Sequence, residues 1–192
     1  MGYIPTISND EVAALEAVHF DGVIEIVDST EQLERACKVL SAESMIGFDT
    51  ETRPSFKAGV SNKIALMQLS TARHCFLIRL NHLPLARPLI SILQNEKIKK
   101  IGADVKNDLA GLQKLRHFTP RGFVDLQSEV GKYGIEDKSL RKMSGIVLGK
   151  RVSKAQRLSN WEAQHFTDQQ MVYAATDAWV CLKIYDALHG RK

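Results

Sequence analysis

The segment from Met45 to Thr52 places two acidic side chains, Asp49 and Glu51, one residue apart at the end of an apolar run. Such a run predicts a buried strand, whose alternate side chains point to the same face, so the two carboxylates are expected side by side. Unpaired buried carboxylates are costly, and no basic residue lies within the run. Oxygen ligands suit Mg²⁺ or Mn²⁺. The pair therefore predicts a site for a divalent metal ion.

A simpler interpretation of the same pair is structural. In that interpretation Asp49 caps a turn and Glu51 is solvated, and an isolated Asp-x-Glu sequence would favour it. The choice depends on whether other acidic side chains of the chain reach the same place.

A third candidate acid is Asp108. It lies between Val105 and Leu115, where the spacing of the leucines predicts an amphipathic helix. Asp104 lies one turn earlier and is a competing candidate. A solvated position on the helix surface is the structural alternative for Asp108.

A fourth acid, Asp177, is paired by its spacing with Tyr173. A capping box at 167–170 predicts a long helix from Asp168 to about Leu188. Residues four apart on a helix share one face, so Tyr173 and Asp177 can reach the same site. The small alanines around them allow this helix to pack closely. A half-buried core aromatic is the alternative role for Tyr173.

The elements that must position these residues follow from hydropathy and turn patterns. Two apolar runs, Ile64–Leu69 and His74–Ile78, flank a polar turn and predict a hairpin beside the strand at Met45. From Lys99 onward strands alternate with helices, which favours parallel pairing on the same sheet. Further strands are predicted at Val23–Val27, Lys99–Gly102 and Phe123–Leu126, and further helices at Asn9–Ala17, from a capping box at Ser29 to Leu40, at Leu85–Leu93, and after Leu126 through about Lys132.

The chain of 192 residues is expected to form one domain, residues 23–192, preceded by a peripheral N-terminal arm, residues 1–22. Its composition, 44% apolar and 25% charged, is that of an ordinary globular protein. Cys37, Cys75 and Cys181 lack metal-ligand spacing and are interpreted as reduced core thiols. No secretory signal or bilayer-spanning run is expected. We therefore expect a cytoplasmic protein without a membrane partner.

The basic residues have an uneven distribution. The segment from Lys138 to Arg157 holds seven Lys and Arg residues and no acid, and the net charge of the chain is +4. Two interpretations remain open: a flank that faces the phosphates of a polyanion, and an ordinary basic surface. Three more candidates for phosphate contact lie in the predicted loop before the hairpin: Arg53, Lys57 and Lys63.

The acidic positions form three motifs that resemble those of the DEDD superfamily of 3′-to-5′ exonucleases, and the Tyr-x-x-x-Asp spacing resembles its tyrosine subgroup. Phe48–Thr52 matches the first motif, Gly102–Leu112 resembles the second, and Tyr173–Ala178 matches the third. The resemblance covers roughly residues 24–188. The order and separation of the three motifs are far more specific than any one of them.

The resemblance implies a ribonuclease H-like α/β fold, in which three antiparallel strands and then two parallel strands form a mixed sheet flanked by helices. It also implies two Mg²⁺ or Mn²⁺ ions, held by the carboxylates of Asp49, Glu51, Asp108 and Asp177. Tyr173 would be the fifth catalytic residue and would orient the attacking water. Its ordinary pKa near 10 favours a hydrogen-bonding phenol over an ionised base.

Contacts to the substrate are also implied by the resemblance. The segment Ser159–Glu162, with Gln170 after it, is similar to one that ribonuclease D and the Werner-helicase exonuclease domain carry before the third motif. Trp161 keeps two open interpretations, a hydrophobic plug and a platform for base stacking. The candidate substrate-binding residues are Thr50, Asn107, Lys154, Arg157, Asn160 and Trp161.

Two departures from the family's patterns affect this interpretation. The histidine subgroup needs His five residues before Asp177, but Val172 lies there, so His165 is interpreted as a surface or loop residue. Ribonuclease D carries helical nucleic-acid-binding domains after its catalytic domain, and we expect none after Lys192. The contacts that bind the substrate would then come from this domain, an oligomer or a separate partner.

These features predict a metal-dependent exonuclease that removes nucleoside 5′-monophosphates from the 3′ end of single-stranded DNA or RNA, without an organic cofactor. Two rival functions remain. One is a nucleic-acid-binding module of the same fold without turnover, and the other is a phosphohydrolase of short oligonucleotides.

Overall fold

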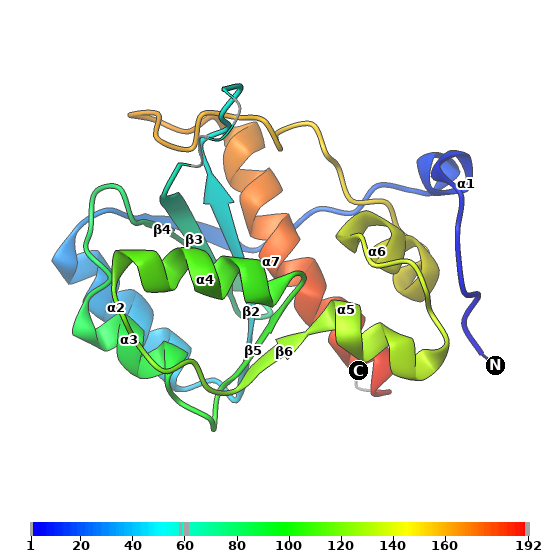
Figure 1. The fold of residues 1–192 in the computed structure, drawn as a ribbon, viewed down its shortest axis with the longest axis horizontal. Coiled ribbons are helices and arrows are strands. Elements are labelled where there is room, and N and C mark those ends of the chain that lie inside the picture. The colour runs from blue at the N-terminus through cyan, green and yellow to red at the C-terminus, as the bar shows by residue number, and fades with distance from the viewer. Residues whose placement is uncertain (1, 58, 60–61, 191–192) are drawn as a thin grey trace.

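A six-stranded mixed sheet forms the centre of the computed structural model, which describes residues 2–57, 59 and 62–190 (Figure 1). The strand order is β1-β4-β3-β2-β5-β6. β2 pairs antiparallel with β3, which pairs antiparallel with β4, while β2, β5 and β6 are parallel. The predicted arrangement of three antiparallel and two parallel strands is therefore confirmed. The strands are β1 (Val23–Val27), β2 (Met45–Thr52), β3 (Ile64–Ser70), β4 (His74–Arg79), β5 (Lys99–Gly102) and β6 (Phe123–Asp125).

The remaining strand, β1, lies at the outer edge of the hairpin. It pairs in parallel with β4, with Val23 opposite His74 and Val27 opposite Ile78. Parallel neighbours need a long crossover, and here the crossover includes α2, β2 and β3. β1 thus extends the sheet beyond the predicted five-stranded core.

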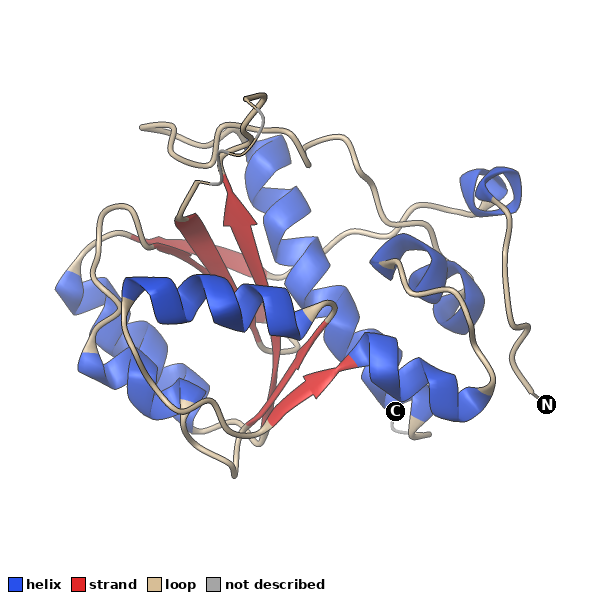
Figure 2. Ribbon diagram, viewed as in Figure 1, coloured by secondary structure: helices blue, strands red, loops and turns tan. Residues whose placement is uncertain are grey.

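Helices cover both faces of this sheet (Figure 2). α2 (Thr30–Ser41), α3 (Arg87–Leu93) and α4 (Val105–Leu115) bury their apolar sides in one hydrophobic core, which includes Ile46 and Phe48 of β2. α7 (Asp168–Leu188) packs on the opposite face, against β2, β3 and β4. The other helices are α1 (Asn9–Ala14), α5 (Leu126–Glu129), the 3₁₀-helix η1 (Val130–Tyr133) and α6 (Leu140–Leu148).

The predicted starts of three helices are confirmed by their caps. The hydroxyls of Ser8, Ser29 and Thr167 accept hydrogen bonds from the third helical N–H of α1, α2 and α7, and all three caps are capping boxes. Some bounds differ from the prediction. α1 ends at Ala14 because the chain becomes extended at Leu15. α3 starts at Arg87, with a proline in its first turn.

One helix, α6, was not predicted, because its apolar positions are few and lie among the basic residues of the segment 138–157. Ser139 caps α6, and the buried Met143 faces the core beside α7. Gly149 ends the helix with φ 63°, a left-handed conformation that glycine adopts at low cost.

The predicted N-terminal arm lies along α6 and is tied to it. The Ile7 N–H donates to Asp137 Oδ2 at 2.9 Å, and Lys150 Nζ lies 2.5 Å from Glu16 Oε2. Gly145 of α6 faces the apolar side chains of the arm. The arm thus holds α6 and the chain that follows it in place.

The cysteine prediction is also confirmed. Cys37, Cys75 and Cys181 are all buried and unpaired with one another. Burial raises the pKa of Cys37 to about 11, so this thiol stays protonated at neutral pH. Within residues 2–57, 59 and 62–190, no helix combines the length and hydropathy that spanning a bilayer requires.

A fully buried lysine, Lys100 of β5, joins the sheet to the end of α3. Its Nζ donates to the carbonyl oxygens of Ile92, Asn95 and Ile98 at 3.1, 2.7 and 2.7 Å. Burial lowers the pKa of Lys100 to about 8, which leaves the ammonium form dominant at neutral pH. The ammonium satisfies carbonyls at the C-terminal end of a helix, where a positive charge is favourable.

Replacing Lys100 with methionine is expected to destabilise the protein, because the stem is kept while three carbonyls lose a buried donor. We expect the free energy of unfolding in urea to fall by about 2–4 kcal/mol. Lys97→Met is the matched control, since Lys97 is exposed, and should change it by less than about 0.5 kcal/mol. Equal effects of the two substitutions would contradict this role for Lys100.

Candidate active site

The backbones of α7 and β2 touch where the acidic residues lie. A Cβ atom on Gly47 would lie 2.0 Å from the carbonyl oxygen of Ala178, so no residue with a side chain fits there. Ala174 and Ala178 are fully buried, which confirms that small residues let this helix pack closely. Asp177 precedes Ala178, and Asp49 lies two residues beyond Gly47 on the same strand face. The contact therefore brings these two acids together.

Three of the predicted acids meet at this contact. Carboxylate oxygens of Asp49, Glu51 and Asp177 all lie within 4.8 Å of one another. Asp49 and Glu51 share one face of β2, as the alternation of the strand requires. Asp177 is 7% exposed, so the group lies at the boundary between core and solvent.

Asp108 reaches the same place from α4. The Thr50 hydroxyl, between the two strand acids, donates to Asp108 Oδ1 at 2.5 Å. Asp104 instead lies at the N-terminal cap position of α4 with φ 62°, is exposed, and accepts a hydrogen bond from Asn107 Nδ2 at 2.8 Å. Of the two competing acids, the structure brings Asp108 to the other carboxylates.

Burial raises the pKa of all four acids, and repulsion by neighbouring carboxylates adds to the rise at Asp49, Glu51 and Asp108. Burial, followed by the Asp177 carboxylate, holds the pKa of Asp49 well above its ordinary value. Burial and then Asp49 raise the pKa of Glu51 to about 10 and that of Asp108 to about 8. Burial raises the pKa of Asp177 to about 7, although a hydrogen bond from Tyr173 opposes this.

No Lys or Arg among residues 2–57, 59 and 62–190 forms an ion pair with these four acids. Hard oxygen donors this close, without a basic partner, suit Mg²⁺ or Mn²⁺. The residues present therefore fit the divalent metal that the sequence predicts.

Tyr173 lies one helical turn before Asp177 and is 9% exposed. Its hydroxyl forms a hydrogen bond with Asp177. Burial and the neighbouring carboxylates raise the pKa of Tyr173, so the phenol keeps its proton and acts as a donor.

Trp161 is fully buried and stacks against Tyr173, with ring centroids 6.1 Å apart and planes at 28°. Phe166 meets its ring edge to face at 5.6 Å. The prediction that Trp161 contacts the substrate is therefore wrong, because a base cannot stack on a ring that the core encloses. The alternative interpretation, a hydrophobic plug, holds.

Sequence reasoning missed Arg79, which fixes the segment around Trp161. Its buried guanidinium donates to the carbonyl oxygens of Ala163 and Gln164 and lies 4.8 Å from the ring centroid of Phe166. A basic residue at the end of a predicted strand carries no signal of such a role. Arg79 thus supports the loop that in turn supports Tyr173.

Basic side chains line a pocket beside the acids, which we name the basic mouth: Arg141, Lys154 and Arg157, together with Tyr173 and Asp177. Arg141 was not among the predicted site residues, since its place on α6 could not be foreseen. Other members of the basic segment serve the fold, as Lys142 pairs with Asp137 at 2.9 Å and Lys150 with Glu16. The structural role of Lys142 and Lys150 fits the interpretation as an ordinary basic surface, whereas contact of the basic mouth with phosphates stays a prediction.

A second pocket, of about 390 Å³, lies on the other side of the acids and is named the α4 pocket. It is lined by Thr50, Glu51, Lys63, Asn107 and Asp108, among others. Two predicted substrate-binding residues, Thr50 and Asn107, thus share this pocket with two of the acids.

The remaining predicted residues lie on exposed loops. Asn160 is exposed, and its side-chain oxygen accepts the Glu162 N–H at 3.1 Å. Arg53 pairs with Glu162 at 3.3 Å and so joins two loops beside the site. Lys57 is exposed, and His165 is an exposed loop residue, as predicted.

Comparison with known proteins gives a sequence match over nearly the whole chain. A model of the 3′-5′ exonuclease family matches residues 24–191. The chain is 33% identical over 158 residues to the bifunctional 3′-5′ exonuclease/ATP-dependent helicase WRN of Mus musculus, a match that covers 78% of this chain and 11% of that protein. It is 29% identical over 168 residues to ribonuclease D of Haemophilus influenzae, covering 85% and 40%. The chain thus spans less than half of either relative.

Solved structures share the fold. The Nibbler EXO domain of Aedes aegypti has a TM-score of 0.79 and 24% identity, with 91% of each chain covered. RNase D of Escherichia coli has a TM-score of 0.78 and 24% identity, covering 87% of this chain and 44% of that one. Trypanosoma brucei RNase D in complex with RNA U12 has a TM-score of 0.79 and 21% identity, covering 98% and 68%. The predicted fold class is confirmed.

The raised pKa values predict how stability depends on pH and metal. Unfolded Asp and Glu release their protons near pH 4, whereas Asp177 and Asp108 hold theirs to about pH 7 and 8 in the folded protein. The metal-free protein should therefore lose stability as pH rises through this range. Mn²⁺ competes with these protons, so the Mn²⁺-induced rise in Tm should be larger at about pH 8 than at about pH 6.

Asp49→Asn separates repulsion from metal binding. Asparagine cannot ionise, so the metal-free variant should lose less stability than the wild type as pH rises from about 6 to about 8, and the substitution should abolish the Mn²⁺-induced rise in Tm. Asp104→Asn is the control and should leave both quantities unchanged. A Mn²⁺ response that survives Asp49→Asn would exclude Asp49 as a ligand.

Proposed function

Because this chain belongs to the 3′-5′ exonuclease family, we propose that it is a metal-dependent exonuclease that shortens single-stranded nucleic acid from the 3′ end and releases nucleoside 5′-monophosphates. The observation that carries the proposal is the meeting of carboxylates from β2, α4 and α7 at one place. These segments are far apart in the sequence, and the acids repel one another. Such a group is costly to keep unless it performs chemistry.

The four acids would hold two Mg²⁺ or Mn²⁺ ions. Glu51 and Asp177 would bind one ion, Asp108 the other, and Asp49 both. When bound, the pair would activate water and stabilise charge on the attacking and leaving oxygens of the phosphodiester.

Tyr173 would position the attacking water. Its phenol stays protonated, already bonds to Asp177, and is held by the stacked ring of Trp161. A donor fixed in this way can orient a water molecule for attack without taking its proton. Trp161 stacks on the Tyr173 ring, and Arg79 holds the loop after Trp161, so both act as positioning residues.

The pockets on the two sides of the acids suggest how a strand would lie. The basic mouth offers Arg141, Lys154 and Arg157 to consecutive phosphates, which suits the continuing strand. The α4 pocket, of about 390 Å³, has a size that suits a single nucleoside, and Asn107 and Lys63 line it. The terminal nucleotide would then occupy the α4 pocket, with the scissile phosphate over the acids.

Both rival functions fit less well. A binding module would gain nothing from repelling acids, and it should hold nucleic acid equally well in EDTA. A phosphohydrolase of short oligonucleotides would not need three free basic side chains beside the site. The reduced state of the three cysteines is compatible with a cytoplasmic location.

One relative is named a ribonuclease and another an exonuclease/helicase, which leaves the sugar of the substrate open. We therefore propose a test with matched DNA and RNA strands that carry a 5′ label. With Mg²⁺ or Mn²⁺ the protein should produce a ladder that shortens from the 3′ end, and EDTA should stop it. Intact strands of both kinds under all metal conditions would refute the proposed activity.

Asp108→Ala and Asp104→Ala form a matched pair for the same assay. The first removes a proposed ligand and should lower kcat/KM by about a hundredfold or more, whereas the second removes an exposed acid four residues away and should leave kcat/KM unchanged. A larger loss for Asp104→Ala would reverse the assignment of the two acids.

Tyr173→Phe tests the role of the phenol. It keeps the ring that packs on Trp161 and removes the donor, so kcat should fall about a hundredfold while the Mn²⁺-induced rise in Tm persists. Loss of the metal response together with activity would instead indicate that Tyr173 supports the metal site.

A further inference from the structure

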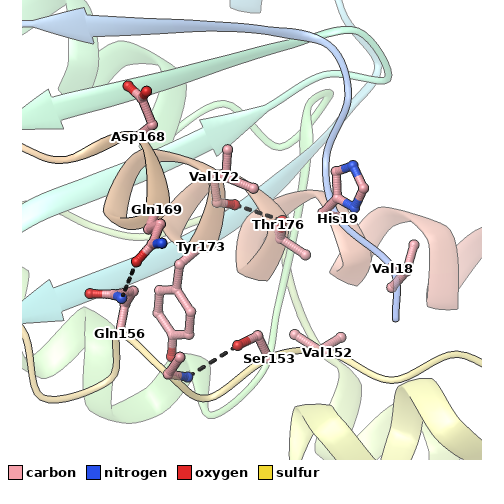
Figure 3. A pocket seen from close by; sticks show the side chains of 11 residues that line it. Val18, His19, Val152, Ser153, Gln156, Asp168, Gln169, Val172, Tyr173 and Thr176 are labelled. Atoms are coloured by element: carbon pink, nitrogen blue, oxygen red, sulfur yellow. Dashed lines mark hydrogen bonds between the residues drawn. The ribbon is translucent and has the colours of Figure 1, made fainter. Parts of the chain in front are cut away.

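A pocket of about 430 Å³ lies between the N-terminal arm, the chain after α6 and the first turns of α7 (Figure 3). Its volume is within the range of about 300–1,000 Å³ that small-molecule sites occupy. Val18, Val152 and Val172 give it apolar walls, and the ring of Tyr173 forms a further wall. We name it the arm pocket.

Two amide side chains, Gln156 and Gln169, line the arm pocket as well. Gln156 Nε2 lies 3.5 Å from Gln169 Oε1, at the long limit of a hydrogen bond, so this contact is easily exchanged for one to a ligand. The Asp168 carboxylate points away from Tyr173 (Figure 3). Apolar walls with a few amides suit a flat heteroaromatic ring better than a charged group.

Hydrogen bonds fix the arm as a wall of this pocket. The Val18 N–H donates to the carbonyl oxygen of Arg151 at 3.0 Å, and the buried Phe20 N–H donates to Thr176 Oγ1 at 3.0 Å. One bond holds the arm to the chain after α6, and the other holds it to α7. The pocket is therefore formed before any ligand binds, which lowers the entropic cost of binding.

The arm pocket adjoins the basic mouth. Val152, Ser153 and Tyr173 line both of them. A nucleotide whose phosphate meets Lys154 or Arg157 could therefore place its base against the outer wall of Tyr173, while Trp161 supports that ring from within the core.

We propose that the arm pocket binds a base of the substrate strand upstream of the terminal nucleotide. This inference rests on the proposed function and deepens it. A base turned into the pocket is unpaired and unstacked from its neighbours, so the pocket selects single strands and sets a minimum length for efficient cleavage. The N-terminal arm thereby becomes part of the substrate site.

The first test fills the pocket with Val172→Trp, on the helix face that lines it, and measures kcat/KM for 5′-labelled strands of two to eight nucleotides. In the wild type kcat/KM should rise once a strand is long enough to reach the pocket. Val172→Trp should lower kcat/KM about tenfold for the long strands and leave the dinucleotide unaffected. Val39→Trp is the control, on α2 at the opposite face of the sheet.

The second test takes its main reading from the wild-type protein, and its one variant, Gln169→Ala, changes an exposed side chain. 2-Aminopurine is placed at successive positions of one strand, and its fluorescence is followed on binding in EDTA. One upstream position should show an emission change that Gln169→Ala reduces. An equal response at all positions, or an equal effect of Val172→Trp at all lengths, would overturn the arm pocket as a base site. Absence of cleavage by the wild type at every length would instead refute the proposed function.

Discussion

Close contact between α7 and β2 is the constraint on which the site depends, because it sets the distance between Asp177 and Asp49. Without a side chain at Gly47, the carbonyl of Ala178 reaches the strand. A methyl group there would push the helix off the sheet and separate the carboxylates. The same contact buries the acids and raises their pKa. The short distance between the carboxylates and their raised pKa values thus both follow from the close approach of these two backbones.

The basic side chains are arranged so that they do not neutralise this group of acids. Arg141, Lys154 and Arg157 stay at the basic mouth, where a polyanion can reach them, while Lys142 and Lys150 pair with acids outside the site. A lysine between the carboxylates would relieve their repulsion and would compete with a metal ion. The fold retains the repulsion among the four carboxylates and confines its energetic cost to one small site.

Much of this arrangement could be predicted from local patterns. Capping boxes and leucine spacing predicted α7 and α4, and the motif spacing selected the four acids that the structure brings together. Features that depend on long-range contacts could not be predicted. The pairing of β1 with β4, the hold of Arg79 on the loop after Trp161, and the arm along α6 all depend on contacts between distant residues, which no local sequence pattern specifies. α6 was missed for another reason, since its apolar positions are few and lie among basic residues.

The large sequence separation of these contacts also determines when the site can form during translation. The bond from Ile7 to Asp137 spans 130 residues, and Asp177 comes last of the four acids along the chain. A ribosome delivers the arm and β2 first, but their partners emerge only with α6 and α7. A nascent chain therefore exposes single carboxylates without a complete ligand set. The complete set of carboxylates therefore comes together only after translation has passed α7.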